Sequence, residues 1–199
     1  MRLPAQQRRS QLLEVAIKLF AEHGFHATSM DDIAEAAGVT KPVVYQHFPS
    51  KRALYRELLD DVDRQLTERL LDATSHATTG RERVQDGFAA YFRYVASHRD
   101  AFRLLFGASV RNDAEFATVA ESAIERIADL IAQLIDIDAG PEHRRTLAHA
   151  MVGMAEATSR RVANDEGEDD PERLARWLGE MAWFGLRGVR ADEPVGEAH

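Results

Sequence analysis

Hydrophobic residues recur every three or four positions along nearly the whole chain, which is the pattern of amphipathic helices and not of strands. The first stripe runs from about Ala5 to His23, and Gly24 follows it as a helix-terminating glycine would. Further stripes predict helices over or around residues 29–38, 40–49, 50–74, 84–95, 102–106, 113–137, 142–163 and 171–189. With no convincing strand alternation and no repeat, the predicted fold is all-α with about nine helices.

The second and third predicted helices are short and separated by a tight turn. Ser29 stands where an N-cap is expected, and Asp32 lies three residues later, the spacing of a capping box. Gly38 ends this helix, and Thr40 caps the next, with Pro42 tolerated in its first turn. The stretch of about 29–48 is therefore predicted to be a helix-turn-helix.

Charge divides the chain into two parts. Residues 1–56 hold 8 Lys and Arg against 5 Asp and Glu, a net charge of +3, whereas residues 57–199 hold 17 against 28, a net charge of −11. A basic head on an acidic body is expected when only one end meets a polyanion. We therefore expect a DNA-binding head at 1–55, a larger helical domain at 56–190 and a disordered tail at 191–199.

Several classes of protein are disfavoured by composition. The chain has no cysteine, so disulfides, thiolate nucleophiles and cysteine-ligated zinc are excluded. No stretch resembles a signal peptide or approaches the roughly 18–20 apolar residues of a membrane span, which predicts a cytoplasmic protein with no membrane partner. No metal motif, phosphate loop or nucleophile–base spacing is visible, so we expect neither an enzyme nor a cofactor or metal.

The third predicted helix carries side chains suited to the major groove of DNA, into which a recognition helix fits. Lys41 could donate to guanine O6 or N7, and Pro42 and Val43 could contact a thymine methyl group. Tyr45 and His47 offer donors to phosphate oxygens, and Lys51 at the start of the following helix adds a positive charge.

The segment from about Arg8 to Leu58 resembles the DNA-binding head of the TetR family of transcriptional regulators. The resemblance lies in "AIKLFAEHGFHATSMDDIAEAAGV" followed by "TKPVVYQHFPSKRALY". It implies an all-helical homodimer whose second domain binds a small molecule that controls DNA affinity. Family base-reading positions fall on Lys41, Pro42 and Val43, and phosphate contacts on Tyr45, His47, Lys51, Ser29 and Met30. The capping residue Thr40 completes the predicted contact set.

One position departs from the family pattern. The family can place a basic or polar base reader near position 31, where this chain has Asp31. Among the bases, a carboxylate typically accepts from the amino group of cytosine, and a role as helix cap is the simpler interpretation.

Aromatic residues at helical spacing in the body allow two interpretations. Spacing alone favours a plain core, whereas the family resemblance implies a ligand pocket among the middle helices, and both stay open. A pocket would be largely apolar and would suit an acyl chain or an aromatic compound. Its candidate residues are Phe88, Tyr91, Phe92, Val95, Phe102, Phe106, Met151, Met154 and Thr158.

The last two predicted helices carry apolar residues on more than one face. We expect them to form a four-helix bundle with a second copy of the chain, the alternative being that both faces are buried within one monomer. The candidate interface residues are Val152, Ala155, Ser159, Trp177, Met181, Phe184 and Gly185.

Together these observations predict a ligand-responsive DNA-binding regulator. Its simplest form is a repressor released from a palindromic operator by a small apolar molecule. A small-molecule carrier or scavenger with a vestigial head is the alternative.

Overall fold

The computed structural model describes residues 3–106, 113–164 and 170–189. This part of the chain is all-α and contains nine helices and no strand, which confirms the predicted fold class. The acidic stretch 165–169 and the predicted tail lie outside the described residues. The helices are α1 (Ala5–Ala27), α2 (Met30–Ala36), α3 (Lys41–His47), α4 (Lys51–Ser75), α5 (Gly80–Ser97), α6 (Arg99–Phe106), α8 (Ala114–Leu134), α9 (Pro141–Asn164) and α10 (Pro171–Gly188).

Gly24 interrupts α1 close to its predicted end. Its φ of 81° lies outside the helical range, and the helix kinks there before continuing to Ala27. A residue with a Cβ rarely adopts this backbone conformation, so the glycine is required by the kink itself. The buried Thr28 hydroxyl closes the turn by donating to the Gly24 carbonyl oxygen at 2.9 Å.

The predicted capping box at the start of α2 is confirmed. The Ser29 amide donates to Asp32 Oδ2 at 2.7 Å, and the Asp32 amide donates to Ser29 Oγ at 3.1 Å. The hydrogen bonds from Ser29 lower the pKa of the Asp32 carboxyl below its ordinary value. Two backbone donors that the helix itself cannot satisfy thus have partners.

The turn between α2 and α3 closes as a Schellman motif. The Gly38 amide donates to the Glu35 carbonyl oxygen at 3.0 Å, and the Val39 amide donates to that of Ala34 at 2.9 Å. Gly38 takes the left-handed conformation that this motif needs, with a φ of 64°. The tight turn follows directly from the glycine that the sequence places there.

The chain divides into two compact units that do not follow the sequence as two continuous segments. One unit comprises Met1–Gln65 with His98–Ser122, and the other comprises Leu66–Ser97 with Ala123–His199. Helices α4 and α8 therefore each begin in the first unit and end in the second. The predicted functional boundary at residue 55 stays a prediction.

An aromatic cluster explains why the first unit is larger than the helix-turn-helix head. Tyr55 on α4 lies with its ring centroid 4.4 Å from that of Phe116 on α8 and 5.0 Å from that of Phe20 on α1. Phe25 joins them, 4.9 Å from Phe116. All four rings are buried, and such pairs add to the burial energy of each ring. The cluster therefore brings the start of α8 into the same core as the head.

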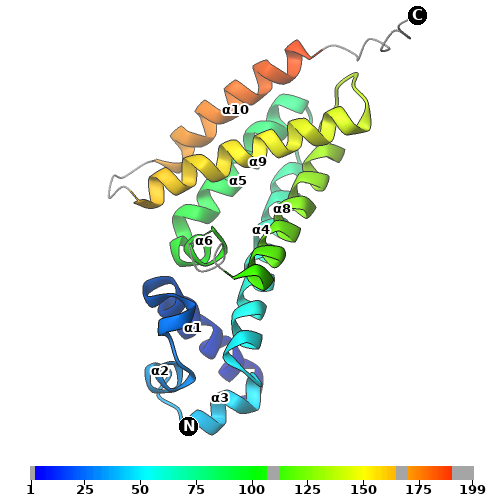
Figure 1. Ribbon diagram of the computed structural model, residues 1–199. Coiled ribbons are helices and arrows are strands. Elements are labelled where there is room, and N and C mark those ends of the chain that lie inside the picture. The colour runs from blue at the N-terminus through cyan, green and yellow to red at the C-terminus, as the bar shows by residue number, and fades with distance from the viewer. Residues whose placement is uncertain (1–2, 107–112, 165–169, 190–199) are drawn as a thin grey trace, which may run out of the picture. The chain divides into compact units, whose positions relative to one another are not determined.

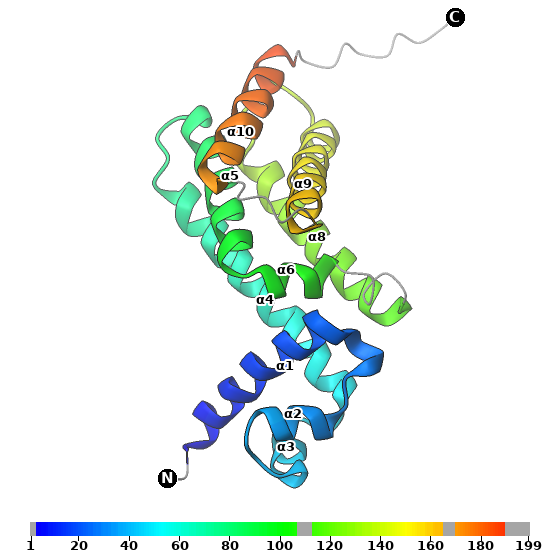
Figure 2. The same ribbon diagram turned by 90° about the vertical axis from the view of Figure 1, so that its left-hand side faces the viewer.

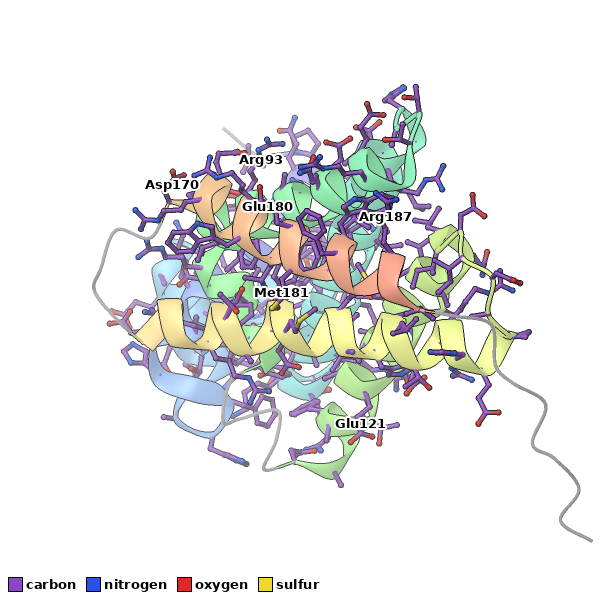
Figure 3. The ribbon with its side chains drawn as sticks, turned by 90° about the horizontal axis from the view of Figure 1, so that it is seen from above. Arg93, Glu121, Asp170, Glu180, Met181 and Arg187 are labelled. Carbon is purple, nitrogen blue, oxygen red and sulfur yellow. The ribbon has the colours of Figure 1, made fainter. Side chains whose placement is uncertain are left out.

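The second unit is a helical bundle in which α5 packs against both α9 and α10 (Figure 1). Part of its core lies where α8, α9 and α10 meet, around Ala128, Ala148 and Leu186. Helices α9 and α10 lie side by side on one face of this unit, as the view in Figure 3 shows.

Candidate nucleic-acid interface

Helix α3 presents one face to solvent and buries the other. It packs against α2 in the first unit (Figures 1 and 2). Val44 is completely buried, whereas Lys41, Pro42 and Tyr45 are exposed and Val43 is half-buried. The predicted base-reading residues therefore lie on or beside the exposed face, at the start of the helix.

Lys41 does not stand alone on that face. Its Nζ lies 2.8 Å from Asp31 Oδ2, so an ion pair joins the first turn of α3 to the first turn of α2. The hydrogen bond to Asp31 raises the pKa of the Lys41 ammonium above its ordinary value. The expectation that Asp31 caps α2 is corrected, because the capping carboxylate is that of Asp32.

This pair was missed by reading the sequence. The two residues are separated by ten positions and by a turn, so no helical spacing relates them. Only the opposite charges in the two first turns hinted at it.

The residues predicted to contact phosphates differ in their exposure to solvent. Tyr45 is 44% exposed, and His47 is half-buried beside Phe48, which belongs to the core. Thr40 occupies the N-cap position of α3, but its hydroxyl makes no capping hydrogen bond, which corrects that expectation. The roles of these three polar side chains toward phosphate stay predictions.

The start of α2 has fewer hydrogen-bond donors available for a phosphate than the sequence predicted. The side chain of Met30 is buried, so only its backbone could approach DNA. The Ser29 amide is already bonded to Asp32, which leaves the serine hydroxyl proton as the donor that could reach a phosphate. Both contacts stay predictions.

Lys51 has a structural role that the sequence did not reveal. Its Nζ donates to the carbonyl oxygens of Phe25 at 2.7 Å and Thr28 at 2.8 Å, and lies 4.4 Å from the Phe25 ring centroid. Burial lowers the pKa of this ammonium below its ordinary value, with the charge of Asp32 opposing that effect. Lys51 therefore ties the start of α4 to the connection between α1 and α2. Its contact with phosphate stays a prediction.

The aromatic side chains predicted for a ligand pocket are buried on α5 in the second unit. Phe88, Tyr91, Phe92 and Val95 are all within the core, and the Tyr91 and Phe92 ring centroids are 5.2 Å apart. The other candidates are placed differently: Met151, Met154 and Thr158 are half-buried on α9, Phe102 is buried in the first unit, and the Phe106 side chain lies outside the described residues.

Two buried hydroxyl groups stand out in this apolar region. Tyr91 Oη and Ser159 Oγ are buried without a hydrogen-bond partner of normal geometry. Burial raises the pKa of the Tyr91 hydroxyl far above its ordinary value, and its neighbour Ser159 acts in the opposite direction. The hydroxyls come from α5 and α9, so sequence spacing gave no sign that they would meet.

The predicted dimer surface needs a correction on α9. Ser159 is fully buried and Ala155 is only 6% exposed within the chain, so neither can face a partner, and Val152 packs against the core. The exposed stripe on α9 instead carries the small residues Ala150, Gly153 and Ala157. On α10, in contrast, Trp177, Met181 and Phe184 are 54%, 55% and 65% exposed, and Gly185 is exposed beside them.

Neither a metal centre nor a membrane span is found in the described part of the chain. Among the described residues, no three His, Asp or Glu side chains gather closely enough to hold a metal ion. The helices of residues 3–106, 113–164 and 170–189 also include none with the length and apolar character of a membrane span.

Known protein families match both parts of the chain. The family described as bacterial regulatory proteins, tetR family, matches residues 12–58, and the tetracyclin repressor-like C-terminal domain matches residues 81–185. The HTH-type transcriptional activator FasR of Mycolicibacterium smegmatis is 34% identical over 190 residues, which cover 94% of this chain and 87% of that protein.

Two further proteins similar to this chain are also transcriptional regulators. The HTH-type transcriptional repressor KstR2 of Rhodococcus jostii is 28% identical over 186 residues, which cover 92% of this chain and 80% of that protein. The crystal structure of a TetR-like transcriptional regulator from Rhodococcus sp. RHA1 matches with a TM-score of 0.78 and 30% identity, covering 94% of this chain and 100% of that one.

The geometry of Lys51 leads to a test of stability. Lys51→Met keeps an unbranched apolar side chain but leaves two carbonyl groups without their charged donor and the Phe25 ring without its ammonium neighbour. We expect a loss of about 1–3 kcal/mol in the free energy of unfolding, measured by urea denaturation. Lys18→Met, at an exposed position of α1, is the control and should change stability by less than about 0.5 kcal/mol. Equal effects of the two substitutions would show that the Lys51 ammonium does not hold the turn.

Proposed function

Because the chain belongs to the TetR family of transcriptional regulators, we propose that it binds a palindromic operator as a homodimer and is released by a small apolar molecule. The observation that carries the proposal is the exposed start of α3, where Lys41, Pro42 and Tyr45 face solvent while Val44 anchors the helix. In a carrier with a vestigial head, we would expect this face to have lost its DNA-binding side chains, but Lys41 and Tyr45 are present and exposed.

We propose that α3 enters the major groove with its N-terminal turn toward the base edges. A groove about 12 Å wide admits one helix, and the first turn is the part that a helix-turn-helix presents to the bases. Lys41, Pro42 and Val43 occupy that turn. Tyr45 and His47 lie further along the helix and are proposed to contact phosphates, together with Thr40, Lys51 and the start of α2 at Ser29 and Met30.

Repression is proposed as the simpler mode of regulation. A dimer that occupies an operator blocks access to it without a further partner, whereas activation requires a favourable contact with the transcription machinery. The names of the two relatives include both an activator and a repressor, so family membership alone leaves the sign of regulation open.

The ligand is proposed to bind in the second unit, beside the buried aromatic rings of α5. Those rings offer an apolar environment, which suits an acyl chain or an aromatic compound. The unpartnered hydroxyls of Tyr91 and Ser159 are the polar groups that could orient such a ligand through one hydroxyl, carbonyl or carboxylate. Met151, Met154 and Thr158, which are half-buried on α9, are proposed to complete the lining.

The dimer is proposed to form through α9 and α10. Trp177, Met181 and Phe184 follow one another at intervals of four and three residues, so they lie on one face of α10. Large apolar side chains that are more than half exposed are typical of an interface. The small exposed residues of α9, in the stripe Ala150, Gly153 and Ala157, would allow close approach of the partner's helices.

The DNA contacts lead to a first prediction. Lys41→Ala should relax the base preference at one operator position at a cost of about 1–3 kcal/mol, whereas Tyr45→Phe should weaken binding to all sequences alike. Competition binding with single-base operator variants measures both effects. Lys18→Ala, which removes a lysine from the exposed side of α1, serves as the control. Unchanged operator selectivity in Lys41→Ala would rule out its role as a base reader.

The dimer surface leads to a second prediction. Gly185→Arg should split the dimer and abolish operator binding without unfolding the chain, because a Cβ at Gly185 meets no other atom within 4 Å. Arg176→Gln, on the same helix but away from the stripe, changes the charge by one unit and should leave the dimer intact. Sedimentation velocity distinguishes monomer from dimer in each variant. If Gly185→Arg remained a dimer, the interface would have to lie on another surface.

The buried hydroxyls lead to a third prediction. Tyr91→Phe and Ser159→Ala each remove an unpartnered buried hydroxyl, which should leave stability unchanged or higher. If the hydroxyls orient a ligand, both variants should nevertheless need about tenfold more ligand for release from the operator, a loss of about 1.4 kcal/mol. The assay is operator release by a panel of straight-chain fatty acids and aromatic acids, with Ser97→Ala as the control. An unchanged response in both variants would favour the plain-core interpretation.

A further inference from the structure

An ion pair joins the first turns of the two helices of the helix-turn-helix. The Lys41 and Asp31 side chains that form it are 50% and 62% exposed, so neither is committed to the core. An exposed pair contributes little to stability. Nor does α2 need Asp31 as a cap, since Ser29 and Asp32 already cap it. Asp31 lies in the first turn of α2, where an acidic side chain interacts favourably with the helix dipole, but this small effect does not require the contact with Lys41.

The chemistry of the pair suggests a reason. An ammonium and a carboxylate side by side present a donor and an acceptor on the surface that faces the DNA. In the major groove, guanine presents the acceptors O6 and N7, and the cytosine paired with it presents its N4 amino donor next to O6. A donor beside an acceptor on the protein thus matches an acceptor beside a donor on this base pair.

We propose that Asp31 and Lys41 read one guanine–cytosine base pair as a unit. Lys41 donates to guanine O6 or N7, and Asp31 accepts from the N4 amino group of the paired cytosine. The inference rests on the proposed docking of α3 in the major groove. It makes Asp31 a specificity-determining residue, although a carboxylate in a DNA-binding head would ordinarily count against binding.

Adenine is the base that could compete for the same pair, because its N7 acceptor lies beside its N6 donor. Guanine fits better because the ammonium of Lys41 meets two adjacent acceptors there, and at adenine it meets one acceptor flanked by a donor. Phosphate fits worst, since the Asp31 carboxylate would repel it. The carboxylate therefore also discourages Lys41 from binding the backbone indiscriminately, which favours specificity over affinity.

The first experiment selects binding sites from a randomised DNA duplex with the full-length wild-type chain and with two variants. Asp31→Ala removes both the charge and the acceptor oxygens beside Lys41, whereas an asparagine would keep an acceptor. Glu35→Ala makes the same change at another exposed position of α2 and is the matched control. We expect wild type and Glu35→Ala to select a guanine–cytosine pair at one position of each half-site. Asp31→Ala should lose about tenfold of that preference and keep the preferences at other positions.

The second experiment tests the cytosine contact directly on the selected operator. Replacing that cytosine by 2-pyrimidinone, which lacks the N4 amino group, should weaken wild-type binding and cost Asp31→Ala little further. This comparison is a double-mutant cycle between protein and DNA. It remains informative for the wild-type chain even if Asp31→Ala folds poorly, because loss of the amino group must then weaken wild-type binding on its own.

The outcomes separate this inference from the function on which it rests. If the wild-type chain selects no sequence at all, both the proposed function and the inference fail. If it selects an operator but Asp31→Ala selects the same one with equal preference, only the inference fails. Selection of adenine at the position that depends on Asp31, or an equal cost of 2-pyrimidinone in both proteins, would also overturn it.

Discussion

The helix-turn-helix formed by α2 and α3 depends on one partly buried ammonium. Lys51, the first residue of α4, donates to the carbonyl oxygens of Phe25 and Thr28 and lies over the Phe25 ring. These carbonyl groups follow the kink at Gly24, where helical hydrogen bonding is interrupted and backbone acceptors need other partners. Because α2 begins shortly after Thr28 and α3 ends shortly before α4, this contact fixes both ends of the helix-turn-helix. The aromatic cluster around Tyr55 then holds the start of α4 in the first unit.

Because these contacts hold the helix-turn-helix in place, the exposed residues of α3 are not needed for packing. Val44 and Phe48 supply the buried anchors, and Lys41, Pro42 and Tyr45 are left to meet a partner. The second unit differs in the character of its surface and of its interior. Its exposed surface on α10 is apolar, which suits a second protein chain, and its buried interior holds two unpartnered hydroxyls, which suits a small molecule. The proposed surfaces for DNA, for a second copy of the chain and for a small molecule therefore differ in their chemical character.

Local features of the fold were predictable from the sequence because short-range physics determines them. The capping box of Ser29 and Asp32, the glycine turn at Gly38 and the periodicity of the long helices all follow from residues within one or two turns of each other. Long-range contacts were not predictable. The Asp31–Lys41 pair and the Tyr91–Ser159 neighbours depend on how helices pack, and so does the burial of Ser159, which removed it from the expected dimer surface.

Regulation as proposed requires that the first turn of α3 lies in the major groove of an operator bound by a dimer. Dimethyl sulfate probes this placement, because it methylates guanine at N7 in the major groove and adenine at N3 in the minor groove. On an operator selected by the wild-type chain, we expect protection of guanine N7 in two half-sites whose centres lie about one helical turn, roughly 34 Å, or a multiple of it apart. Adenine N3 should stay reactive there. Reactive guanine N7 together with protected adenine N3 would show that α3 does not enter the major groove.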